Sequence, residues 1–194
     1  MGRVLGEDFA PVLASARDGD EVSFAALWRE LQPPLLRYLT VAAGGAAEDL
    51  ASETWLRVAR SLGSFDGDEH GFRGWVFTIA RHRLLDWRRR EGRARTVPRP
   101  VEALDGRGGA DDPAAEAMNR LSTDAALRLL GRLPADQAEV VMLRAVAGLD
   151  VPHVARVLGT RPGTVRVLAH RGLRRLAELL VDASEDPSTG VVTP

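Results

Sequence analysis

The chain has 194 residues, no cysteine and a net charge of −1, and arginine supplies all 26 of its basic residues. The lack of cysteine excludes disulfides, thiolate catalysis and cysteine-ligated metal sites. No apolar run approaches the ~20 residues that span a bilayer, and the N-terminal sequence lacks the apolar core of a signal peptide. We therefore expect a cytoplasmic protein without membrane insertion.

The first half of the chain carries apolar residues at helical spacing. Pro33 and Pro34 interrupt the first of these patterns, so we expect a kink or a break there. The second pattern starts with acidic residues, which suits the positive end of a helix dipole. The sequence therefore predicts helices at 22–40, 48–62 and 72–90, with a polar loop at 63–71.

The composition changes after residue 91, where arginine, proline, glycine and aspartate replace the large apolar residues. Such a segment is typical of a flexible linker. Helical spacing returns over 114–133, and Asp136 is placed to cap a further helix that ends near Gly148. Because β-type alternation is absent, we predict an all-α fold of two small helical domains joined by this flexible linker.

The chain is organised around residues 148–180, where the pattern predicts a short helix, a tight turn and a longer basic helix. Asp150 is a suitable N-cap, and Pro152 fits the first helical turn. Gly159 stands where the end of a helix needs a left-handed residue. A buried stripe is predicted along the second helix, formed by Val165, Leu168, Ala169, Leu173, Leu176 and Leu180.

This pair of helices has the pattern of a helix-turn-helix, whose second helix enters the major groove of DNA. No acidic residue occurs between Asp150 and Glu178, so phosphate would meet a positive surface there. The alternative is an ordinary helical hairpin with a solvated arginine face. We favour DNA binding over that alternative.

A second basic segment, residues 81–95, contains seven arginines and follows several aromatic residues. Arginine side chains follow phosphates, and aromatic rings stack on unpaired bases. Trp75 and Trp87 have helical spacing and are expected in the core. Phe65 lies in the polar loop, where an exposed ring would stack on an extruded base. A ring tucked into the core is an equal alternative for Phe65.

The start of the predicted 48–62 helix is acidic. It is either a solvated, dipole-favoured helix start or a docking face for a basic partner. The charges alone do not separate these two interpretations. The residues concerned are Glu48, Asp49, Ser52 and Glu53.

One segment, DGDEHG, resembles the opening of a calcium loop. The twelfth position of that loop is Phe77, where a glutamate ligand is required. The four histidines also lack the spacing of metal ligands. We therefore expect no metal site, no cofactor, no catalytic residue and no enzymatic activity.

Three stretches, in this order, resemble the extracytoplasmic-function (ECF) sigma factors, the small two-domain members of the sigma-70 family of bacterial transcription initiation factors. Region 2.2 of that family is resembled by EDLASETWLRVARSLGSF, and regions 2.3 and 2.4 by FRGWVFTIARHRLLDWRRR. Region 4 is resembled by LPADQAEVVMLRAVAGLDVPHVARVLGTRPGTVRVLAHRGLRRL. The resemblance covers roughly residues 18–180.

The resemblance implies three functional surfaces. The one that binds the β′ clamp of RNA polymerase would contain Asp49, Leu50, Glu53 and Arg57. The one that reads and melts the −10 element would contain Phe65, Asp66, Asp68, Arg81, His82, Arg89 and Arg90. The one that faces the −35 element would contain Arg161, Gly163, Thr164, Arg166, Val167, His170, Arg171 and Arg174.

The resemblance also implies a region 2 domain at 18–91, a linker at 92–115, a region 4 domain at 116–181 and a disordered tail at 182–194. The implied partners are promoter DNA and core RNA polymerase, bound through the β′ clamp and the β flap, with an anti-sigma factor as a further candidate. Two alternatives stay open. One is a stand-alone helix-turn-helix regulator that acts without polymerase, and the other is an inactive, sigma-like adaptor.

Overall fold

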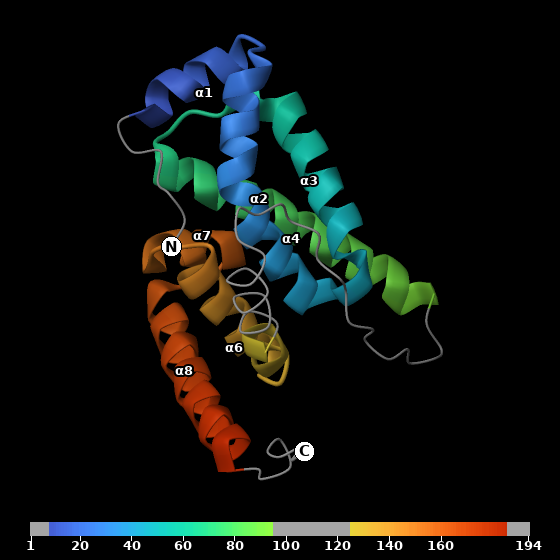
Figure 1. Ribbon diagram of the computed structural model, residues 1–194, viewed down its shortest axis with the longest axis vertical. Coiled ribbons are helices and arrows are strands. Elements are labelled where there is room, and N and C mark those ends of the chain that lie inside the picture. The colour runs from blue at the N-terminus through green and yellow to red at the C-terminus, as the bar shows by residue number, and fades with distance from the viewer. Residues whose placement is uncertain (1–7, 95–124, 186–194) are drawn as a thin grey trace, which may run out of the picture.

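The computed structural model of the protein describes residues 8–94 and 125–185 (Figure 1). Over these residues it contains helices and their connections and no strand, which confirms the predicted all-α class. Nearly all of the predicted linker lies outside the described residues. The same holds for the predicted tail, except that residues 182–185 continue the last helix.

The chain begins with helix α1, Phe9–Arg17, and the long helix α2, Glu21–Ala43. Asp20 caps α2, because its carboxylate accepts the backbone N–H of Ser23 at 2.8 Å. Helix α2 runs on through its two prolines, so of the predicted kink or break the break is excluded. Each internal proline costs ~3 kcal/mol or more, and each buried apolar side chain returns ~1.5–3 kcal/mol. The buried face of α2 consists of Leu27, Leu31, Leu35, Tyr38 and Leu39.

Two further helices complete the first half: α3, Ala47–Ser61, and α4, Glu69–Ala94. A short 3-10 turn, Gly44–Ala46, joins α2 to α3, and another, Leu62–Ser64, follows α3. Both α3 and α4 pack against α2. The helices predicted at 48–62 and 72–90 are therefore present, and α4 begins three residues earlier than predicted.

The second half contains a helical segment at 125–130, α6 at Ala135–Val141, a π-helical turn at Met142–Val146 and then α7, Val151–Leu158, and α8, Pro162–Glu185. Helix α8 packs on both α6 and α7. The glycine at position 172 permits the contact with α6, because a Cβ there would lie 2.8 Å from Cγ2 of Val141. Helix α8 therefore meets α6 at a point where any larger residue would force the Val141 side chain or the helices to shift.

The buried line of α8 differs from the predicted stripe. Val165, Gly172 and Leu179 are buried, at intervals of seven residues. Leu173 and Leu180 are 55% and 50% exposed, so their predicted burial is wrong. Each of them follows a buried position by one residue, and one residue turns a helix by about 100°.

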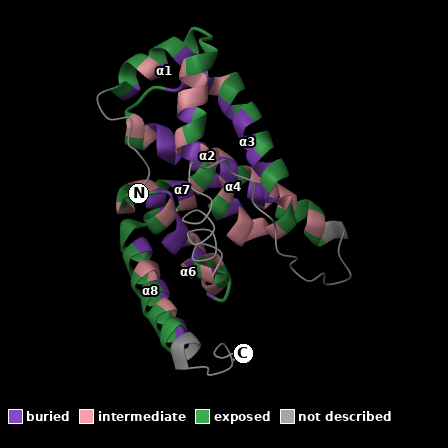
Figure 2. Cartoon of the chain, in the orientation of Figure 1, coloured by how far each residue is buried: buried purple, intermediate pink, exposed green. Residues whose placement is uncertain are grey.

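The two halves of the chain pack directly on each other. Helix α7 lies against α4, while α6 and the π-helical turn lie beside α2 (Figure 1). Buried side chains form one continuous cluster through both halves, and they line the facing sides of the helices in Figure 2. The two predicted domains therefore form one packed body over the described residues.

Candidate nucleic-acid interface

The helix-turn-helix is held by the caps that the sequence predicts. The carboxylate of Asp150 accepts the backbone N–H of His153 at 2.8 Å and contacts the His153 ring nitrogen at 2.7 Å. These two hydrogen bonds lower the pKa of Asp150 below its usual value. Gly159 ends α7 in the left-handed conformation, with φ of 65°. The turn therefore sets the start of α8 at a defined angle to α7.

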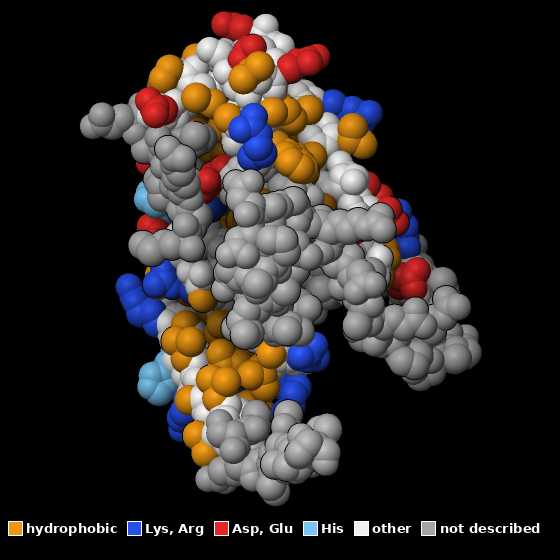
Figure 3. Space-filling model, viewed as in Figure 1, with side chains coloured by type: hydrophobic (Ala, Val, Ile, Leu, Met, Phe, Trp, Pro, Cys, Tyr) orange, Lys and Arg blue, Asp and Glu red, His pale blue; other side chains and the backbone are white. Residues whose placement is uncertain are grey.

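The outer face of α8 is open to solvent. Arginine and histidine side chains follow the edge of this helix in Figure 3. Arg174 lies 3.5 Å from Glu178, which neutralises part of the charge at that end. All of the residues predicted to face the −35 element are exposed, namely Arg161, Gly163, Thr164, Arg166, Val167, His170, Arg171 and Arg174.

Helix α3 presents a second open face. Asp49, Glu53 and Arg57 are exposed on it, whereas Leu50 is only 2% exposed and belongs to the core. Leu50 therefore supports this face from beneath and offers no surface of its own. Leu56 is a further candidate for this face, because it is 57% exposed beside Arg57. The helical spacing of the buried residues, 50, 54 and 58, already excludes Leu56 from their line.

The loop before α4 is built around a buried ring. Phe65 is 8% exposed, and its ring centroid lies 5.4 Å from that of Phe72 and 5.0 Å from that of Trp75. A Cβ at position 67, where φ is +154°, would lie 3.0 Å from this ring. The interpretation of Phe65 as an exposed stacking residue is therefore wrong, and the core alternative holds.

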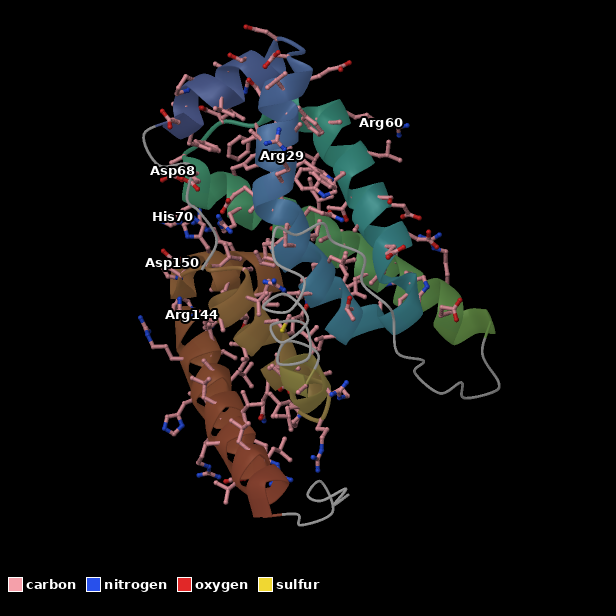
Figure 4. All side chains as sticks on the ribbon, viewed as in Figure 1. Arg29, Arg60, Asp68, His70, Arg144 and Asp150 are labelled. Atoms are coloured by element: carbon pink, nitrogen blue, oxygen red, sulfur yellow. The ribbon has the colours of Figure 1, made fainter. Side chains whose placement is uncertain are left out.

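The acidic residues of this loop differ in their roles. Asp66 and Asp68 are both exposed. Asp68 also caps α4, because its carboxylate accepts the backbone N–H of Gly71 at 2.7 Å. Asp68 and His70 lie at the start of α4, on the side that faces Asp150 at the start of α7 (Figure 4). The loop thus has fixed ends and an exposed acidic tip.

The basic part of α4 is split between solvent and the second half of the chain. His82, Arg89 and Arg90 are exposed, and Arg89 lies 3.3 Å from Asp86. Arg81 is half-buried, and its Nε donates to Oε1 of Glu139 on α6 at 3.0 Å. The structure therefore gathers three of the four basic residues predicted for −10 DNA on an open surface and covers the fourth.

The described part of the chain contains no group of three side chains suited to hold a metal ion. Within the same residues, no helix has the length and the apolar character needed to cross a membrane.

Sequence models of known protein families match both halves of the chain. The sequence model of Sigma-70 region 2 matches residues 27–94, and that of Sigma-70, region 4 matches residues 123–176. The ECF RNA polymerase sigma factor SigD of Mycobacterium tuberculosis is 33% identical over 187 residues, which cover 93% of this chain and 87% of SigD. The chain belongs to the ECF sigma factors. As a sigma factor it is a transcription initiation factor associated with RNA polymerase, and the stand-alone regulator is not favoured.

A further relative supports this family assignment. BldN of Streptomyces coelicolor, also an ECF RNA polymerase sigma factor, is 36% identical over 169 residues, which cover 86% of this chain and 64% of BldN. Two solved structures share the fold at 23% identity. CnrH, in complex with the cytosolic domain of CnrY, has a TM-score of 0.61 over 88% of this chain and 96% of that chain. RpoE of Bartonella quintana, in complex with the anti-sigma factor NepR, has a TM-score of 0.62 over 81% of this chain and 96% of that chain.

Proposed function

We propose that this sigma factor directs core RNA polymerase to promoters by reading the −35 element with α8 and by capturing the melted −10 element with region 2. The observation that carries the proposal is the outer face of α8. It is basic and exposed, and it is presented by a helix-turn-helix whose caps fix its angle. This is the geometry with which a recognition helix enters a major groove.

At the −35 element, the two ends of the α8 face have different roles. Arg166, His170 and Arg171 lie far enough along the helix to contact base edges. Arg161 and Thr164 lie at its start, where backbone N–H groups and positive charge favour phosphate. An arginine that donates two of its guanidinium N–H groups to a guanine discriminates against other bases by ~1–3 kcal/mol.

At the −10 element, the exposed tip of the Asp66–Asp68 loop and the open basic side of α4 form the capture surface. Melting DNA costs ~1.4 kcal/mol per base-pair step. Each unpaired base that is stacked or pocketed returns ~1–3 kcal/mol. A few captured bases therefore offset the cost of a short bubble. His82, Arg89 and Arg90 would hold the backbone of the strand.

Polymerase would bind the α3 face. Asp49 and Glu53 supply negative charge, Arg57 a positive charge, and Leu56 an exposed apolar side chain suited to the centre of an interface. The β′ clamp is the partner proposed for this face, and the β flap is proposed for region 4. Promoter opening then needs no catalytic residue in this chain, and it takes place in the cytoplasm where polymerase acts.

An anti-sigma factor is a further proposed partner. RpoE of Bartonella quintana is bound to the anti-sigma factor NepR in a structure that shares this fold. The present chain has exposed apolar side chains on α8, Leu173 and Leu180, which DNA recognition does not use.

The test is transcription in vitro with start-site mapping. Core RNA polymerase, this protein and fragments of its own genome are combined, and the transcript starts are compared with those from core alone. We expect new, discrete starts that share paired −35 and −10 motifs. Tight binding of the protein alone to a palindromic duplex, without new starts, would contradict the proposal.

A further inference from the structure

The ring of Phe72 connects helix α1 to the loop that precedes α4. Phe72 lies near the start of α4 and is 2% exposed. Its ring centroid lies 5.7 Å from that of Phe9 on α1 and 5.4 Å from that of Phe65 in the loop. Trp75 packs beside them, with its centroid 5.8 Å from that of Phe72. The rings form one aromatic cluster, which joins α1, the loop and α4 at one end of region 2 (Figure 1).

Within this cluster, the Phe65 ring supports the backbone of the loop tip. A Cβ at Gly67 would lie 3.0 Å from Cζ of this ring, and a Cβ at Gly71 would lie 3.8 Å from the same atom. The backbone therefore rests on the ring at two points. The return of the loop into α4 is fixed by a hydrogen bond, in which the backbone N–H of Phe72 donates to the carbonyl of Asp68 at 2.8 Å. The conformation of the tip thus depends on where the Phe65 ring is held.

Helix α1 contributes Phe9 to the cluster. Phe9 is 4% exposed, and α1 packs on α2. Together with Leu27 and Leu31 of α2 and Arg73 of α4, Phe9 lines a small hollow. Removing this ring would enlarge the hollow and take away the dispersion contacts on one side of Phe72. Helix α1 also precedes residues 27–94, which match Sigma-70 region 2, so this support lies outside the matched segment.

We propose that Phe9 is a positioning residue for −10 capture: through Phe72 it holds the Phe65 ring beneath the loop tip. The inference rests on the function proposed above, in which this loop captures unpaired bases. Phe9 is buried and acts only through the other rings. With the ring in place, the tip presents Asp66 and Asp68 in a fixed arrangement before DNA arrives. A preorganised loop binds more tightly because it loses less freedom on binding.

The size of the effect follows from the cost of ordering a loop. Ordering the backbone of one residue at the moment of binding reduces the affinity ~5–30-fold. Phe9→Ala should therefore weaken the binding of holoenzyme to a single-stranded −10 oligonucleotide by a factor in this range. The exposed faces of α3 and α8 contain none of these rings. Core binding and binding to a −35 duplex should therefore not change.

The order of the loop can be measured on the free protein, because the chain contains no cysteine. A spin label is attached through Asp66→Cys at the exposed tip, and its mobility is recorded by electron paramagnetic resonance. We expect an ordered label in the otherwise unchanged chain and a mobile label after Phe9→Ala. The matched control is Leu13→Ala, which truncates a side chain of the same helix that is also 4% exposed. Leu13 has no ring to pack on Phe72, so this control should leave the label ordered.

A milder variant keeps the test decisive if Phe9→Ala does not fold. Phe9→Leu keeps most of the apolar volume but loses the ring, and its label should be more mobile than that of Leu13→Ala. Circular dichroism checks that each variant keeps its helices. Equal label mobility in the Phe9 variant and the unchanged chain, or in the Phe9 variant and Leu13→Ala, would overturn the positioning role.

The oligonucleotide measurement uses holoenzyme without the label and links the order of the loop to DNA. Unchanged affinity in Phe9→Ala, despite a mobile label, would overturn the role of Phe9 in −10 capture. If holoenzyme with the unchanged chain does not bind the oligonucleotide, the proposed −10 function itself fails. The label measurement contains neither polymerase nor DNA, so these two failures are distinguishable.

Discussion

Nε of Arg81 lies 3.0 Å from Oε1 of Glu139, although 58 positions separate the two residues in the chain. The contact joins a helix proposed to meet the −10 element to the domain proposed to read the −35 element. It leaves the α8 face open and covers one basic residue of α4. The two proposed recognition surfaces of this sigma factor therefore differ in their exposure to solvent, and separate substitutions can test them.

Arg171→Ala should weaken −35 recognition by about 1–3 kcal/mol and relax the sequence preference at one base pair, as for an arginine that contacts a base edge. The measurement is transcription by the assembled holoenzyme from promoters that differ at each −35 position. The control is Arg175→Ala, whose guanidinium lies 3.0 Å from Glu178 and which lies outside the predicted −35 set. An equal loss on every promoter would instead assign Arg171 to a phosphate.

Asp150→Ala should lower the free energy of unfolding by about 1 kcal/mol at pH 7, the usual cost of losing an N-cap. The hydrogen bonds from His153 depress the folded pKa of Asp150. The stabilisation is therefore present above the unfolded pKa of about 3.9 and is lost as the pH falls through the lower folded value. Urea titrations at several pH values should show the two proteins converging in acid. Asp66→Ala, which removes an exposed loop carboxylate, should cost less, and an equal cost would contradict the capping role.

Gly172→Ala should destabilise the protein by about 1–3 kcal/mol, because the added methyl group would overlap the buried Val141 side chain. Gly92→Ala is the matched control, since a Cβ there meets nothing within 4 Å. The control should be neutral or stabilising by up to about 1 kcal/mol. Thermal unfolding of both variants measures the difference. Wild-type stability in Gly172→Ala would show that α8 and α6 do not cross as closely as described.

Phe65→Ala should destabilise the free protein by about 3–5 kcal/mol, because a buried aromatic ring is removed from beside Phe72 and Trp75. Phe65→Leu, which keeps most of the apolar volume, should lose less. Unfolding in the absence of DNA is the measurement. Unchanged stability in Phe65→Ala would restore the interpretation of Phe65 as an exposed stacking residue.

The sequence was most informative where the structure depends on neighbours in the chain. The carboxylate of Asp150 and the left-handed Gly159 act within one or two turns of their own helices. Their position could therefore be predicted without knowledge of the fold. The basic character of the α8 face could be predicted in the same way, because the sequence has no acidic residue between Asp150 and Glu178.

Features that depend on distant segments could not be predicted in this way. The continuity of α2 through Pro33 and Pro34 depends on burial against other helices. The exposure of Leu173 depends on where α6 crosses α8, since only that contact decides which residues of an apolar stripe are covered. The pairing of Glu139 with Arg81 joins charges whose local sequence shows nothing unusual. Tertiary packing decides all three.

Permanganate footprinting shows whether this chain opens promoters together with polymerase. A promoter mapped by transcription is incubated with core polymerase, with this protein, or with both, and unpaired thymines are detected. We expect reactive thymines in the −10 region only when both proteins are present. Protection of the duplex by this protein alone, with no reactive thymines after core is added, would exclude promoter opening with polymerase and favour a regulator that binds without polymerase.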